Sequence, residues 1–188
     1  MIISVGRNHP KKGFHEMIDV LLELKQRSND FAIVVVGNET HTLDAIAKEA
    51  GVEEDFYTIP EISNSGETQI GSFPSRQLVE LYRASDIFAY PSYLETYANV
   101  AVEAMAAGIP VVLTDAPGCY ETLRDGEEGF IVPVKNSKAM AEKIIAIHED
   151  EQLRKRFIDA GLRKAERQDW AEVALRYIDV YQSTMPGA

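Results

Sequence analysis

The chain has 188 residues, 45% apolar and 26% charged, which suits one globular domain over residues 1–188. Its 30 acidic and 19 basic side chains give a net charge of −11, which argues against a nucleic-acid partner and gives no indication of a membrane surface. A single cysteine, Cys119, no signal peptide and no apolar run of about 18 residues predict a cytoplasmic protein without a membrane span.

Short β-branched runs alternate with amphipathic segments along the chain. Unbroken apolar runs predict strands that are covered on both faces, and apolar residues recurring near every 3.6 positions predict helices. In chain order we expect a strand at 2–5, a helix at 13–27, a strand at 31–36, a helix at 40–50, a strand at 56–59, a helix at 75–83, a strand at 86–90, a helix at 97–107, strands at 110–113 and 129–132, and helices at 137–148, 151–167 and 170–184.

This alternation predicts an α/β fold. We expect a Rossmann-like three-layer sandwich, with a parallel sheet of about six strands, helices on both faces and a helical carboxyl-terminal tail. Residues 60–73 form a polar connection that is long for a compact domain, and such connections are often functional. The last helix carries a broad apolar stripe that includes Trp170 and Tyr177. Two interpretations are open: the stripe packs on its own domain, or it covers a neighbouring one.

Ligands of an open parallel sheet bind beyond the carboxyl ends of its strands. The loop after the first strand, GRNHPKKG, contains no G-x-G-x-x-G, and the chain contains no G-x-x-x-x-G-K-[ST]. A dinucleotide site of Rossmann type and a P-loop are therefore disfavoured. No Asp-x-Asp pair occurs either, which removes the commonest carboxylate clip for a metal-bound diphosphate. A phosphate bound here would be neutralised by protein cations and backbone amides.

Both kinds of group, cationic side chains and free backbone N–H groups, are expected at this edge of the sheet. Arg7 and Lys12 flank the first loop, where an arginine fork or a lysine point charge can hold phosphate oxygens. The helix that begins near residues 97–99 directs its free N–H groups at the same edge, and a helix N-terminus attracts anions. For Lys12 an ordinary solvated surface charge is the alternative.

Two glutamates stand out beside these cations. Glu95 precedes the helix, and Glu103 lies inside it among small apolar residues. A buried carboxylate is costly unless it has partners. A vicinal diol, such as the edge of a ribose, would satisfy both oxygens of Glu103, and a backbone N–H or an arginine of the protein is the alternative partner.

The segment PSYLETYANVAVEAMAAGIPVV resembles the signature of two glutamates with seven residues between them in retaining glycosyltransferases of family 4, which have the GT-B fold. VGRNHPKKG, VVVGNE, LVELYRASDIFAYPS and PGCYETLRDGEEGFIVP resemble flanking segments of that family in the same order. Family members have two Rossmann-like domains that face across a cleft. The resemblance covers the carboxyl-terminal, donor-binding domain. It implies a missing amino-terminal domain that binds the acceptor, toward which the last helix, 170–184, packs.

The resemblance also implies a role for each matching residue. Arg7 and Lys12 hold the diphosphate, and Glu95 contacts sugar hydroxyls or the developing charge at the anomeric carbon. Glu103 binds the ribose hydroxyls, and backbone N–H groups at the start of the following helix hold the distal phosphate or the sugar. The remaining donor-binding positions are Gly37, Tyr97, Ala98, Asn99 and Val100.

The implied activity is transfer of a sugar from a nucleoside-diphosphate sugar, with a UDP-sugar favoured, to a glycan, lipid or small-molecule acceptor. No metal or other cofactor is implied. The isolated chain is expected to be inactive, because transfer needs both reactants oriented together. Two alternatives stay open: a non-catalytic module of the same fold that binds a nucleotide or a protein, and another GT-B enzyme such as a sugar epimerase.

Overall fold

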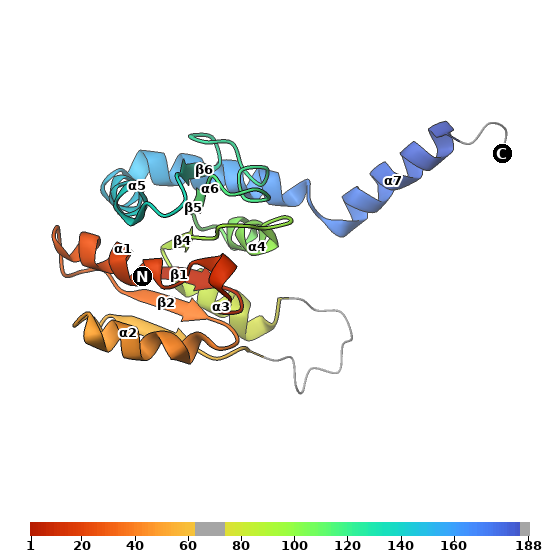
Figure 1. The fold of residues 1–188 in the computed structure, drawn as a ribbon. Helices are drawn as coiled ribbons and strands as arrows, with labels where there is room; N and C mark the ends of the chain where they lie inside the picture. Colours follow the sequence, from red (N-terminus) through yellow and green to blue (C-terminus); the bar gives the residue numbers. More distant parts are fainter. Residues whose placement is uncertain (63–73, 185–188) are drawn as a thin grey trace.

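A computed structural model describes residues 1–62 and 74–184. Six parallel strands form one sheet in the order β3–β2–β1–β4–β5–β6 (Figure 1). This confirms the predicted Rossmann-like α/β fold. The strands are β1 (Ile2–Val5), β2 (Ile33–Val36), β3 (Phe56–Ile59), β4 (Ile87–Tyr90), β5 (Val111–Thr114) and β6 (Gly129–Val132).

Helices cover both faces of this sheet. The chain steps outward from β1 to β3 and then outward on the other side from β4 to β6, and right-handed crossovers in opposite directions place helices on opposite faces. On one face α1 packs against α5, and on the other α4 packs against α6 (Figure 1). The helices are α1 (Glu16–Lys25), α2 (Asp44–Glu49), α3 (Arg76–Ala84), α4 (Asn99–Ala106), α5 (Ser137–Glu149), α6 (Glu151–Glu166) and α7 (Trp170–Thr184), with 3-10 turns η1 (Pro10–Lys12) and η2 (Thr40–Leu43).

The predicted elements are found in the predicted order, with shifts at their ends. The helix expected at 13–27 begins only at Glu16, because the separate turn η1 and a further turn precede it. The helix expected at 40–50 is divided into η2 and α2. The helix expected at 97–107 begins at Asn99. Most of the connection predicted at 60–73 lies outside the described residues.

The order of the strands decides where a ligand can bind. Every residue of β1, β2, β4 and β5 is buried, as their largely apolar sequences predict, and the buried set includes the polar Ser4 and Thr114. The strand β1 pairs with both β2 and β4, so the strand order reverses beside its carboxyl end. In doubly wound sheets this reversal opens the crevice that holds ligands. The loops after β1 and β4 are therefore the place to look for a site.

The last helix, α7, projects away from the sheet and its covering helices (Figure 1). None of its residues is buried, and the side chain of Trp170 is 85% exposed. The predicted apolar stripe is thus not buried on its own domain, and the covering of a neighbouring domain stays a prediction. None of the described helices combines the length and the apolar character that crossing a membrane requires.

Candidate functional site

The loops after β1 and β4 are joined backbone to backbone. The N–H of Tyr93 donates to the carbonyl of Lys11 at 2.7 Å. The hydroxyl of Ser92 lies 3.1 Å from the same carbonyl. Because these bonds span some 80 positions of sequence, they hold the segment that contains Lys12 against the segment that contains Glu95.

The loop after β5 supports the β4 loop from the other side. The N–H of Glu95 donates to the carbonyl of Pro117 at 2.9 Å. Gly118, at φ +77°, lies so close that an added Cβ would stand 2.4 Å from the carbonyl oxygen of Glu95. Only glycine fits this approach, because any other side chain would meet backbone as well as an unfavourable φ. Gly118 therefore helps to fix the position of Glu95.

Gly37, directly after β2, also allows two loops to approach closely. An added Cβ there, at φ +146°, would lie 2.0 Å from the carbonyl oxygen of Gly6. The two loops are tied further by Asn8, whose N–H donates to the Asn38 carbonyl at 2.8 Å and whose side-chain amide donates to the Thr42 hydroxyl at 2.8 Å. Close packing of the two backbones explains why glycine stands at position 37. Its predicted contact with the nucleotide-sugar donor stays a prediction.

The carboxylate of Glu95 is the centre of a hydrogen-bonded cluster. Its Oε1 forms an ion pair with Nζ of Lys12 and accepts hydrogen bonds from the Tyr90 hydroxyl at 2.7 Å and the Ser92 hydroxyl at 3.1 Å. The Glu95 side chain is only 11% exposed. Among the described residues no donor contacts its other oxygen, Oε2. One oxygen of this carboxylate is therefore held by the protein, and the other is available to a ligand.

Lys12 and Glu95, which the sequence predicts at one site, are in contact. The sequence did not predict the roles of Tyr90 and Ser92, although a tyrosine at the end of an otherwise apolar strand was a signal. Burial, followed by the bond to Glu95, raises the pKa of Tyr90 far above its usual value, so this hydroxyl stays a donor. Lys12 also stands over the Tyr90 ring, with Nζ 5.6 Å from its centroid.

Cys119 lies buried behind this cluster. Burial, and then the negative charge of Glu95, raise the pKa of its thiol to about 12, against smaller opposite effects of Thr114 and Lys12. The thiol is therefore protonated near neutral pH. Because the thiolate is the reactive form and Cys119 is 0% exposed, this side chain contributes to packing.

The side chain of Arg7 is exposed at the same edge of the sheet. Within residues 1–62 and 74–184 it forms no ion pair. Lys12, in contrast, is already paired with Glu95. The two predicted phosphate ligands thus differ: Arg7 is exposed, whereas binding of an anion by Lys12 would compete with Glu95.

The backbone at the start of α4 offers fewer donors than the sequence indicated. The N–H of Ala98 donates to the carbonyl of Gly118 at 3.2 Å, and the N–H of Asn99 donates to the carbonyl of Tyr97 at 2.9 Å. For the N–H groups of Tyr97 and Val100, the described part of the chain supplies no acceptor. Two of the four predicted donors are therefore used within the protein, and the other two keep the predicted role.

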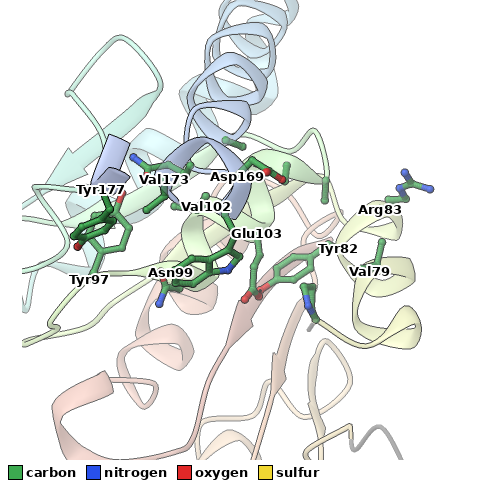
Figure 2. A pocket seen from close by; sticks show the side chains of 16 residues that line it. Val79, Tyr82, Arg83, Tyr97, Asn99, Val102, Glu103, Asp169, Val173 and Tyr177 are labelled. Carbon is green, nitrogen blue, oxygen red and sulfur yellow. The ribbon is translucent and has the colours of Figure 1, made fainter. Parts of the chain in front are cut away.

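Glu103 points away from the sheet. The residues of α4 that face the core are Ala101, Ala104 and Met105, whereas Glu103 is half-buried beside α3. Its Oε2 accepts a hydrogen bond from the Tyr82 hydroxyl at 3.1 Å, and Figure 2 shows the two groups side by side. The protein partner of this carboxylate is thus a tyrosine, not the backbone N–H or arginine considered from the sequence.

A pocket of about 730 Å³ opens between α3, α4, the end of α6 and the start of α7 (Figure 2). Glu103 lies in its wall, together with residues from all four segments. The walls are mostly apolar and aromatic, so few polar groups of the protein surround this carboxylate. Among the lining residues are Tyr82, Tyr97, Asn99, Glu103, Trp170 and Tyr177.

Burial raises the pKa of Glu103, and the bond from Tyr82 lowers it by less. A carboxyl group whose pKa is raised on folding favours the folded state below its unfolded pKa and costs stability once pH rises through the folded pKa. We therefore expect Glu103→Gln to raise the melting temperature at pH 7, with a gain that vanishes below about pH 4. Thermal unfolding at both pH values measures this.

The exposed Glu142 of α5 supplies the matched control, because Glu142→Gln removes the same charge from an acidic chain without a burial effect. A gain from Glu103→Gln that is equal at pH 7 and pH 4, or no larger than that of the control, would contradict a destabilising charge at Glu103.

Comparison with known proteins identifies the family. The family model of the glycosyl transferases group 1 matches residues 1–164. The chain belongs to this family. Its six-stranded fold is that of the carboxyl-terminal domain of GT-B glycosyltransferases. Within the described residues, no group of three or more His, Cys, Asp or Glu side chains is placed to hold a metal ion.

The relatives of this group 1 domain include biosynthetic sugar transferases. The phosphatidyl-myo-inositol mannosyltransferase of Mycobacterium leprae is 29% identical over 184 residues, which cover 97% of this chain and 46% of that protein. The carboxyl-terminal domain of a group 1 glycosyl transferase from Francisella tularensis has a TM-score of 0.72 at 26% identity, covering 88% of this chain and 84% of that one. HepE of Anabaena, solved in complex with UDP, has a TM-score of 0.79 at 24% identity, covering 98% and 49%. The chain spans about half the length of the curated relatives it matches.

Proposed function

We propose that this domain is the donor-binding half of a retaining glycosyltransferase. The full protein transfers a sugar from a nucleoside-diphosphate sugar, with a UDP-sugar favoured, to a glycan, lipid or small-molecule acceptor. The observation that carries the proposal is the Glu95 carboxylate, held through Oε1 by Lys12, Tyr90 and Ser92 beside the switch point of the sheet. Membership of the group 1 family supports it. The UDP bound to HepE, which shares the fold, supports the choice of nucleotide.

The two cations act on the leaving group. As the bond between the anomeric carbon and the phosphate oxygen breaks, negative charge grows on the departing nucleoside diphosphate. Positive charge that is already in place lowers the barrier to this step, because no reorganisation is needed. Arg7 is exposed and can contact the diphosphate, and Lys12 is held near the same edge by its ion pair with Glu95. The proposal includes no metal or other cofactor.

The two glutamates act on the two sugars of the donor. Glu95 turns Oε2 toward a hydroxyl of the transferred sugar, or toward the positive charge that develops at its anomeric carbon. Glu103 accepts hydrogen bonds from the ribose hydroxyls. Each carboxylate has one oxygen bonded to a protein hydroxyl, from Tyr90 or from Tyr82. The donor is thereby held on both sides of its diphosphate.

The acceptor site belongs to a preceding half of the protein. Support comes from the relatives, of whose length this chain covers about half. It also comes from α7, whose large apolar side chains are exposed along its whole length. We place the amino-terminal domain against this face of α7. No nucleic acid or membrane contact is part of the proposal for this chain.

A transfer assay tests the proposed activity. The chain alone is expected to give no sugar transfer, and the protein completed by its preceding half is expected to give a product with the anomeric configuration of the donor. Proton NMR of the first product formed distinguishes the two anomers. Turnover by the isolated chain, or an inverted product, would contradict the proposal. If the completed protein binds the donor without transferring sugar, the non-catalytic module is favoured, and if it releases a free epimerised sugar, an epimerase is favoured.

A further inference from the structure

Tyr82, at the end of α3, has an unusual environment for a polar side chain. It is 0% exposed, and its ring packs against Phe88 with the centroids 6.1 Å apart. Its hydroxyl lies 3.1 Å from Oε2 of Glu103 and 3.3 Å from the carbonyl oxygen of Val100, both on α4. A buried hydroxyl that loses its acceptor costs free energy. The packing of the ring therefore fixes a donor directly beside Glu103.

We propose that Tyr82 is the positioning residue of Glu103. It holds Oε2, so that the carboxylate keeps one orientation and presents Oε1 to the ribose hydroxyls of the donor. Among the described residues no donor contacts Oε1. The inference rests on the proposed function, which assigns the ribose to Glu103. Tyr82 acts through Glu103 and is not itself a catalytic residue.

The physical advantage is pre-organisation. A glutamate side chain has several rotamers, and the freedom it loses when a ligand binds reduces affinity. The hydroxyl of Tyr82 restricts that freedom before the ligand arrives, as outer partners of metal ligands do. The bond also joins α3 to α4, so the two helices share one fixed point at the pocket wall.

The test compares a nucleoside diphosphate with its 2′,3′-dideoxy analogue, using whichever of UDP, GDP and ADP the parent chain binds best. We expect the parent to prefer the ribose form about 10-fold or more, because the analogue lacks both hydroxyls. Tyr82→Phe should reduce this preference by about 3- to 10-fold while changing the affinity for the analogue by less than about 2-fold. Calorimetry measures both affinities, and binding of the analogue shows that the variant is folded.

Tyr90→Phe is the matched control. Tyr90 is equally buried at 1% exposed, and its ring packs on the same Phe88 at 5.7 Å, but its hydroxyl serves Glu95. Because Tyr90 serves Glu95, this variant should change the affinities for the nucleotide and for the analogue by the same factor, and so keep the preference for ribose. A preference that Tyr82→Phe retains in full, or that both variants lose equally, would overturn the positioning role. A parent without any preference would instead contradict the assignment of ribose to Glu103 in the proposed function.

Discussion

Glu103→Ala is expected to weaken nucleoside-diphosphate binding by about 10- to 150-fold. The range corresponds to the ~1.5–3 kcal/mol that a hydrogen bond to a charged group contributes. The carboxylate beside Tyr82 is half-buried, so its loss leaves the ribose hydroxyls without a charged acceptor at that place. Isothermal calorimetry on the parent and the variant measures the change.

The control for this change is Glu142→Ala on α5, which removes an exposed charge from the opposite face of the sheet. It should leave the affinity unchanged. Glu103→Ala should remain folded at pH 7, because it removes a carboxylate whose pKa burial has raised and the Tyr82 hydroxyl keeps the carbonyl of Val100 as an acceptor. A variant that binds as tightly as the parent would show that Glu103 does not hold the ribose.

Gly118→Ala is expected to destabilise the domain by about 2–5 kcal/mol. The new Cβ would meet the carbonyl oxygen of Glu95 at 2.4 Å, at a backbone angle, φ +77°, that alanine seldom adopts. Both loops are tied to strands of the sheet, so neither can move aside without breaking the bond between Glu95 and Pro117. Urea denaturation measures the loss of stability.

Gly126→Ala separates the clash from the backbone strain. Gly126 has nearly the same angle, φ +76°, but an added Cβ there would have no heavy atom within 4 Å. This variant should lose only about 1–2 kcal/mol, the usual cost of a left-handed conformation. If the two variants lost equal stability, the close approach of the loop after β5 to Glu95 would contribute nothing beyond the backbone strain.

The sequence was sufficient for the elements that local patterns determine. Short, largely apolar runs placed the buried strands, and the residue range predicted for the last helix is that of α7. Ends determined by distant contacts were not predictable in this way. Helix α4 begins directly after Ala98, which has no side chain that could cap the helix. The N–H of Ala98 donates instead to the carbonyl of Gly118, in another loop.

The residues of the candidate site also fall into those that the sequence predicts and those that it does not. Lys12 and Glu95 are 83 positions apart, and they were placed together only because strand order and the edge rule bring their loops to one place. No comparable rule predicts the hydrogen-bond partners of the two glutamates, Tyr82 and Tyr90. In the sequence Tyr82 reads as an ordinary core aromatic, and Tyr90 differs only by its place at the end of an apolar strand; the three-dimensional packing shows where each hydroxyl points.

The central claim is that this chain holds the donor nucleotide through its own cations and hydrogen-bonding groups. Calorimetric titration with UDP, GDP and ADP, each with and without EDTA, tests it most directly. We expect one of the three, with UDP favoured, to bind with a Kd between about 10 µM and 1 mM, and with the same affinity when EDTA is present. Binding of none of them, or binding that EDTA abolishes, would contradict the claim.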